Sequence, residues 1–446
     1  MDGDEIRKVV RETNYVTWRR QAGWEPLVVT RAQGSCFYDA AGKEYLDFSS
    51  QLIATNLGHG NAAVAKAIAD QAHSVAYAAP SFATEARAQA SLALLDVLPK
   101  GLGRFFFSTS GTEANEAALK IARAVTGRTK VLARYRSYHG STAASMSVTG
   151  EFRRRASEKL QKVPGTVFAP DCYCYRCPFG LTYPDCNVAC ADYVDYQLSR
   201  EGDVAAMIVE PVVGTNGVIV PVPEYLPKIR SITKKHDVLL IADEVMSAWG
   251  RVGEWFAVNH WNVVPDILTT AKGITGAQIP LGLTATTAAV HDAFRENYFP
   301  HGHTYEAHPL TLAPAVAAIA EYRRLHLLEK SRKDGEYLLA RLREIQDRHP
   351  SVGEVRGLGL FAAVELVKNR TTKEPFNTED DKMAGRPLLV DQVTGAMLKE
   401  GVFCIGWVSH LVVAPPLIVT REELDRGLAA LDKALAVADA KVEPSG

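Results

Sequence analysis

The sequence predicts an α/β fold in which a large, mostly parallel sheet is joined by a smaller α+β domain. Between about residues 60 and 325, apolar runs of four to seven residues alternate with Ala-rich helical stretches, as in parallel sheets covered by helices on both faces. Short strands and amphipathic helices lie on either side of this region. At 446 residues and 47% hydrophobic composition, the chain is long enough to bury such cores.

The first 60 residues predict one part of the smaller domain. After a charged helical start, two strand-like runs, Ser35 to Asp39 and Lys43 to Phe48, flank Ala41-Gly42. A glycine in a short connection between two such runs is typical of a hairpin.

The central region predicts the large sheet. Its clearest apolar runs, each read as a strand, occupy residues 105–107, 131–133, 205–209 and 238–242. Open α/β sheets bind ligands beyond the carboxyl ends of their strands, so the residues that follow these runs are the candidates for function.

The C-terminal region predicts the rest of the smaller domain. A long helical stretch covers roughly residues 314–349, and residues 355–366 read as one strand opened by glycines. A helix over 390–401, a strand near 411–413 and an amphipathic helix from Thr420 follow.

Charge and composition narrow the class of protein. A formal net charge of -1 gives no basic surplus for nucleic acid, so the expected ligand is small. The acidic N-terminus lacks an apolar core, and no run of about 18 apolar residues occurs, which indicates a soluble, cytoplasmic protein with no membrane partner. Seven cysteines, an odd number in so long a chain, are expected to be reduced thiols.

Charged residues end three of the predicted buried strands. Glu210 follows residues 205–209, Asp243 follows 238–242, and Lys272 follows a further apolar run. Asp243 and Lys272 form the leading pair, because the coenzyme pyridoxal phosphate requires an acid and a lysine. The lysine must bond to the coenzyme aldehyde, and the carboxylate must keep the pyridine nitrogen protonated. Alone, Asp243 reads equally well as a helix cap or ion-pair partner, and most lysines are simply solvated.

Two further loops follow predicted strands. Ser110, Gly111 and Thr112 precede an Ala-rich helix, whose first amides and dipole suit a phosphate; a plain helix cap is the alternative. Tyr138 and His139 follow residues 131–133, where Tyr138 can stack on a flat ring; ordinary loop packing is the alternative.

These residues, in this order, resemble a known family. The chain is similar over nearly its whole length to the class III (subgroup II, ω-type) aminotransferases of the fold type I pyridoxal phosphate enzymes. The motifs that carry the resemblance are Ser110 to Ala114, Tyr138 to Gly140, Glu210-Pro211, Asp243 to Val245, Gly250-Arg251, Pro265-Asp266, Lys272-Gly273, Gly302 to Tyr305, His308-Pro309 and Pro415 to Leu417.

The resemblance implies a role for each matching residue. Lys272 becomes the Schiff-base lysine, Asp243 the partner of the pyridinium nitrogen, and Tyr138 and Val245 the two faces of a ring sandwich. The phosphate would be bound by Ser110, Gly111 and Thr112. The other cofactor-binding residues implied by the resemblance are His139, Glu210 and Thr304.

The resemblance also implies an architecture and an assembly. It implies a seven-stranded large domain over residues 61–325, with a small domain built from residues 1–60 and 326–446. Thr304 would reach the phosphate bound by a neighbouring subunit, which implies a homodimer with shared active sites and leaves a tetramer open.

Two departures from the family pattern bear on the substrates. Val412 stands where many members that use glutamate and 2-oxoglutarate carry an arginine, and Met246 stands where many carry a glutamine. Without that guanidinium a fixed clamp for a dicarboxylate is missing, so pyruvate is the predicted acceptor and an amine or ω-amino acid the predicted donor. This variation resembles the amine, taurine and β-alanine transaminases that use pyruvate.

Other functions remain as alternatives. Within the coenzyme class they are a 2-oxoglutarate-dependent ω-amino acid aminotransferase, of the 4-aminobutyrate or diamine type, and an aminomutase or decarboxylase. A nucleotide-dependent oxidoreductase would need the three glycines of a dinucleotide-binding loop. The nearest match, residues 356–359, lacks the third glycine. A non-catalytic binding protein would not need both Lys272 and Asp243.

Two more sets of residues have a functional and a structural interpretation. Leu52, Tyr77, Phe82 and Trp249 are predicted to face the substrate by analogy, with interface or core packing as the alternative. Cys172, Cys174, Cys177, Cys186 and Cys190 have spacings that also fit a structural zinc site, but the family needs no metal and none is predicted.

Overall fold

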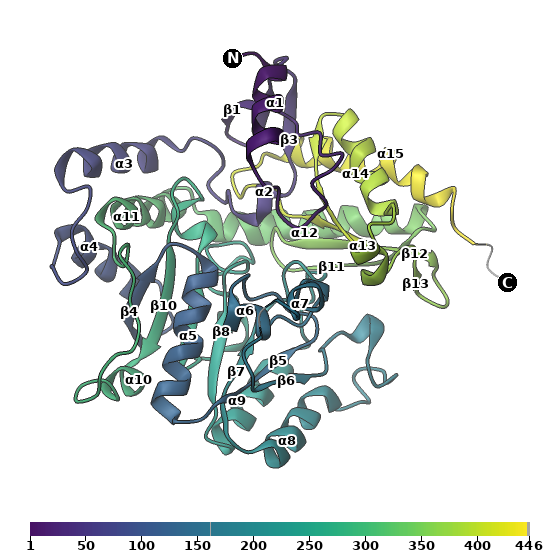
Figure 1. Cartoon of the computed structure of the whole chain (residues 1–446). Coiled ribbons are helices and arrows are strands. Elements are labelled where there is room, and N and C mark those ends of the chain that lie inside the picture. Colours follow the sequence, from purple (N-terminus) through teal and green to yellow (C-terminus); the bar gives the residue numbers. More distant parts are fainter. Residues whose placement is uncertain (161, 444–446) are drawn as a thin grey trace.

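The computed structural model describes residues 1–160 and 162–443 and is built around a seven-stranded sheet with strand order β4-β10-β9-β8-β7-β5-β6 (Figure 1). Only β10 runs antiparallel to its two neighbours. The prediction of a large, mostly parallel sheet is therefore confirmed. Its strands are β4 (Leu102–Ser108), β5 (Lys130–Arg134), β6 (Thr166–Ala169), β7 (Val204–Val209), β8 (Leu239–Asp243), β9 (Ile267–Thr270) and β10 (Gly282–Thr287).

Helices cover both faces of this sheet, because successive residues of its strands point to opposite sides. In β7, which is buried throughout, Ile208 packs in the cluster formed with α5, whereas Met207 packs in the cluster formed with α8 and α9. The helices of this domain are α3 (Ala62–Ser74), α4 (Glu85–Leu95), α5 (Gly111–Thr126), α6 (Ala143–Ser147), α7 (Phe152–Ser157), α8 (Ala189–Glu201), α9 (Tyr225–Lys235), α10 (Ala288–Asp292) and α11 (Pro309–Arg324).

Both ends of the chain contribute to a second, smaller region. The predicted hairpin is present as β2 and β3, and β3 also pairs in parallel with β14, so one sheet contains strands from both chain ends. The exact domain boundaries stay a prediction. The strands of this region are β1 (Val29–Gln33), β2 (Cys36–Asp39), β3 (Glu44–Asp47), β11 (Val352–Gly357), β12 (Ala362–Asn369), β13 (Glu374–Pro375), β14 (Val402–Phe403), β15 (Ile405–Trp407) and β16 (His410–Val413).

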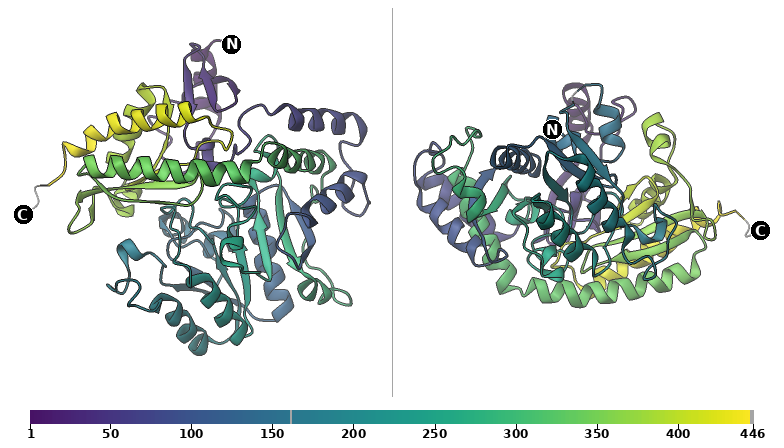
Figure 2. Two further views of the ribbon diagram at one scale, coloured as in Figure 1. Left: turned by 180° about the vertical axis from the view of Figure 1, so that it is seen from behind. Right: turned by 90° about the horizontal axis from the view of Figure 1, so that it is seen from below.

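The helices of the small region include the long α12, which lies alongside α15 (Figure 2). The final helix begins after Thr420, whose side chain caps it as a capping box. The helices are α1 (Gly3–Thr13), α2 (Ser50–Ile53), α12 (Leu327–Arg348), α13 (Glu379–Ala384), α14 (Leu389–Lys399) and α15 (Arg421–Asp439). None of the helices formed by the described residues is long and apolar enough to cross a membrane.

Two predicted elements are each divided in the structure. The single strand predicted over residues 355–366 is wrong: β11 and β12 form a hairpin, because Gly359 adopts a left-handed φ of +60° and reverses the chain. The helical stretch over 314–349 is likewise two helices, α11 and α12, separated where His326 takes a φ of 50°. A left-handed residue cannot continue a right-handed helix.

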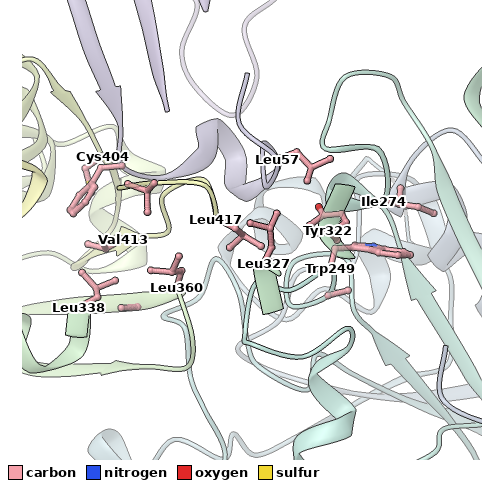
Figure 3. Packing of buried hydrophobic residues seen from close by; sticks show 14 of the residues in the cluster. Leu57, Trp249, Ile274, Tyr322, Leu327, Leu338, Leu360, Cys404, Val413 and Leu417 are labelled. Atoms are coloured by element: carbon pink, nitrogen blue, oxygen red, sulfur yellow. The ribbon is translucent and has the colours of Figure 1, made fainter. Parts of the chain in front are cut away.

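A continuous hydrophobic core links the two regions. Figure 3 shows Trp249, Tyr322 and Ile274 at one end of the labelled set and Leu360, Val413 and Cys404 at the other, all in one cluster of buried residues. A charged side chain in this contact region, that of Arg251, is fully buried. Its Nη1 donates to the carbonyl oxygens of Leu360 (2.9 Å) and Pro415 (2.6 Å), and its Nη2 donates to Ser50 Oγ (3.0 Å) and Asn56 Oδ1 (2.7 Å).

We expect Arg251→Met to destabilise the fold by about 3 kcal/mol, because the methionine leaves buried carbonyl groups without donors. Urea unfolding followed by circular dichroism measures the change. Arg343→Met, at an exposed position of α12, is the matched control and should unfold like the unaltered protein. An equal stability of both variants would contradict the structural role of Arg251.

Candidate active site

The predicted functional residues meet at one edge of the large sheet. Strands β5, β7, β8 and β9 are parallel and adjacent, so their carboxyl ends lie side by side. Tyr138 N donates to Glu210 Oε1 at 3.0 Å, and His139 Nδ1 lies 2.7 Å from Asp243 Oδ2. Residues predicted from separate strand ends therefore form one site.

The Asp243 carboxylate is buried and held by three groups of the protein. Its Oδ2 accepts from Asn115 Nδ2 at 2.7 Å and also contacts His139, and its Oδ1 accepts from Val245 N at 3.1 Å. Asn115 is itself oriented by Thr269, whose hydroxyl donates to Asn115 Oδ1 at 2.6 Å. The carboxylate is thus fixed in one orientation, as a partner for a pyridinium nitrogen must be.

Lys272 is partly buried near these acids. It lies two residues after the end of β9, in a left-handed conformation with a φ of 51°, and its carbonyl accepts from Ala277 N at 3.1 Å. Burial lowers the pKa of its amine to about 8, although the charges of Asp243 and Glu210 act in the opposite direction. A pKa near neutrality provides an uncharged, nucleophilic amine, which is the form that attacks a carbonyl carbon.

The turn before α5 is shaped for an anion. Ser110 caps the helix, with its Oγ accepting from Glu113 N at 3.2 Å. A Cβ at Gly111 would lie 2.8 Å from both methyl groups of Val245, and a Cβ at Gly140 would lie 2.9 Å from Thr112 Oγ1. The turn thus adjoins Val245 on one side and the loop after Tyr138 on the other. With the positive end of a 16-residue helix, these residues fit a phosphate whose attached ring lies between Tyr138 and Val245.

The four residues predicted to face the substrate differ in their exposure. Leu52 and Phe82 are 71% and 65% exposed, and Tyr77 donates from its hydroxyl to the carbonyl of the exposed Thr304 at 3.1 Å. Trp249 is 1% exposed and donates from Nε1 to Thr270 Oγ1 at 2.8 Å within the core (Figure 3). Core packing explains Trp249 without a ligand, and the substrate roles of all four predicted residues stay predictions.

The sequence reasoning missed residues that the structure places at the site. Asn115 is a polar residue on the buried, Ala-rich face of α5. Its position interrupts the apolar face that helical periodicity predicts, so the sequence does contain a signal for it. Glu151 and Arg153 are also buried, and the guanidinium of Arg153 lies over the ring of Tyr138. Nothing local in the sequence distinguishes Arg153 from its neighbours.

The cysteine cluster forms a compact group of free thiols. Cys172, Cys174, Cys177, Cys186 and Cys190 line a small cavity together with aromatic residues such as Tyr173 and Phe179. Within residues 1–160 and 162–443, no group of three or more His, Cys, Asp or Glu side chains is arranged to hold a metal ion. The absence of a metal stays a prediction that elemental analysis can test.

Taken together, the partly buried lysine, the oriented aspartate and the anion-binding turn define a pyridoxal phosphate enzyme. When bound, this coenzyme provides an electron-withdrawing ring that stabilises negative charge on the substrate carbon. Comparison with known proteins identifies the family: the model of the class III aminotransferases matches residues 18–435, and the chain belongs to this family.

Relatives within the family differ in their named reactions. A leucine/methionine racemase from Thermococcus litoralis is 34% identical, with 93% of this chain and 91% of the relative covered. A taurine–pyruvate aminotransferase from Bilophila wadsworthia is also 34% identical, with 99% of each chain covered. A solved structure of a taurine:2-oxoglutarate aminotransferase from Bifidobacterium kashiwanohense, in complex with pyridoxal phosphate and glutamate, has a TM-score of 0.94 at 34% identity, with 99% of each chain covered.

We expect the covalent attachment of pyridoxal phosphate to the apoenzyme to accelerate between pH 7 and pH 9. With a pKa of about 8, the reactive neutral form of Lys272 rises from about one tenth to about nine tenths over this range. Stopped-flow absorbance of the coenzyme measures the rate. A midpoint near the ordinary lysine value of 10.5 would contradict the partly buried environment of Lys272.

Proposed function

We propose that the enzyme transfers an amino group from an amine or ω-amino acid to pyruvate. The observation that carries this proposal is the partly buried Lys272, whose amine has a lowered pKa near Asp243 and Glu210, combined with the apolar surroundings of Val412. Val412 is 1% exposed and belongs to a hydrophobic cluster, so β16 offers no guanidinium for the second carboxylate of 2-oxoglutarate. The taurine–pyruvate relative supports the same pair of substrate classes.

Each residue of the site has a separate role in this proposal. Lys272 would hold the coenzyme and would move a proton to and from the substrate carbon. Asp243 would keep the pyridine nitrogen protonated, and Asn115 and His139 hold Asp243 in place. The ring would lie between Tyr138 and Val245, and the phosphate would be bound by Ser110, Gly111 and Thr112.

The same proposal includes a homodimer with shared sites. The exposed Thr304 lies in a surface region with the exposed aromatic residues Tyr77 and Tyr305, whose ring centres are 6.3 Å apart. Exposed apolar residues gathered in this way suit burial against a second copy of the chain, where Thr304 would reach the partner's phosphate. The seven free thiols suit a reducing compartment, so we place the dimer in the cytoplasm.

Separated half-reactions test the transfer. The coenzyme band near about 410 nm should disappear on adding an amine and return on adding pyruvate, with alanine as the product. Lys272→Ala should lose both the band and the turnover. Strong turnover with 2-oxoglutarate would contradict the interpretation of Val412, and racemisation or release of carbon dioxide without a keto acid would favour the alternatives.

Light scattering on the purified enzyme tests the assembly. We expect a mass of twice the chain's 48.6 kDa or a multiple of it. Thr304→Ala should keep that mass but bind the coenzyme more weakly, by about tenfold, because one phosphate hydrogen bond is lost. An active monomer would overturn the proposed sharing of sites.

A further inference from the structure

A further cavity lies at the edge of the large sheet and is lined by a different set of residues from the candidate active site. It is bounded by β4, the edge strand, by β10 beside it, and by the helices α5 and α10. Its volume is about 450 Å³, which is within the range of sites that enclose small molecules. A ligand in this cavity would therefore be distinct from the coenzyme and from a substrate at Lys272.

Four phenylalanine rings form the apolar part of the cavity. Phe105 and Phe106 belong to β4, whereas Phe294 and Phe299 follow α10, and all four side chains are only half-buried. The ring centre of Phe299 lies 5.8 Å from that of Phe106 and 5.1 Å from that of Phe294. Because an aromatic wall left in contact with water is unfavourable, this surface favours a ligand with a flat or apolar body.

His301 adds an unsatisfied hydrogen-bond donor to this wall. Its ring lies against Phe106, with centres 4.9 Å apart, and its Nδ1 lies 3.1 Å from Lys120 Nζ. Because an ammonium group can only donate, Nδ1 accepts, and the proton of the neutral ring is on Nε2. Burial and the charges of Lys120 and His303 lower the pKa of the His301 ring, which favours that neutral form. Nε2 is buried and has no hydrogen-bond partner in the described part of the chain.

The charged side chains of the lining favour an anion. The exposed Arg104, on β4, donates among the described residues to the carbonyl oxygen of Gly103 at 3.1 Å and pairs with no acid there. An acid, Glu306, also lines the cavity, but Arg87 Nη2 already donates to its Oε1 at 3.0 Å. The charge left beside the aromatic wall is therefore positive.

We propose that this cavity binds a small monocarboxylate with an aromatic or apolar body. The body would lie against the phenylalanine rings, and the carboxylate would accept from His301 Nε2 and be attracted by Arg104. Water alone would satisfy Nε2 but would leave the rings uncovered, so a ligand with both parts fits better than solvent. Binding of such a ligand requires no reaction at Lys272.

Isothermal titration calorimetry of the coenzyme-loaded enzyme with hydrocinnamate tests the site. This probe has a phenyl ring and a carboxylate but neither an amino nor a keto group, so it cannot be transaminated. We expect His301→Leu and Arg104→Gln each to raise Kd by about tenfold, because each removes a partner of the carboxylate. Val290→Trp, on α10, should abolish binding by filling the cavity. Hydrocinnamide, which lacks the charge, should bind about tenfold more weakly.

Two control variants remove similar side chains outside the cavity. Arg295→Gln removes an exposed arginine close to α10, and His73→Leu removes an exposed histidine of α3. Both should bind hydrocinnamate like the unaltered enzyme. The kcat/KM for pyruvate should be unchanged in His301→Leu and Arg104→Gln, because neither residue belongs to the candidate active site. These two variants decide the test if Val290→Trp fails to fold.

Three results would overturn the proposal. They are no heat of binding at millimolar hydrocinnamate, an unchanged Kd in both His301→Leu and Arg104→Gln, and binding confined to a dissociated monomer. The last result would show that a second copy of the chain fills the cavity. An enzyme that binds hydrocinnamate as expected but transfers no amino group would contradict the proposed function alone.

Discussion

The site depends on keeping charged side chains in a place from which water is excluded. Buried ionisable groups are unfavourable unless the protein supplies partners in fixed positions. Here the parallel strands β7, β8 and β9 deliver Glu210, Asp243 and Lys272 to one sheet edge, and α5 adds Asn115. The hydrogen-bond partners of Asp243 fix the orientation of its carboxylate, and burial lowers the pKa of the Lys272 amine. The same arrangement therefore stabilises the buried charges and prepares the two groups for catalysis.

The same physical constraint applies to a second buried charge near the site. Asp243 has partners in the protein on both of its carboxylate oxygens, whereas Arg153 is buried with Nη2 unpaired in the described part of the chain. The family relationship accounts for the class of chemistry, and relatives within the family have different named reactions.

Much of the fold could be predicted because its signals are local. Buried strands gave continuous apolar runs, and the hairpin β2–β3 was marked by glycine. The strand predicted over residues 355–366 failed because an apolar run does not reveal a reversal, which here depends on the left-handed Gly359 packing against Arg251 and Val252. The burial of Arg153 could not be predicted, since it depends on contacts with aromatic rings elsewhere in the sequence.

The sequence by itself determined the fold class and the pairing of Asp243 with Lys272, because strand periodicity and the chemistry of side chains at strand ends are properties of short segments. Only the tertiary structure decided which groups hold Asp243, why Trp249 lies in the core, and that Arg153 packs on the ring of Tyr138. These outcomes come from contacts between distant segments: Asn115 and Asp243, whose side chains lie 2.7 Å apart, are separated by 128 positions. Their proximity is decided by the folded chain.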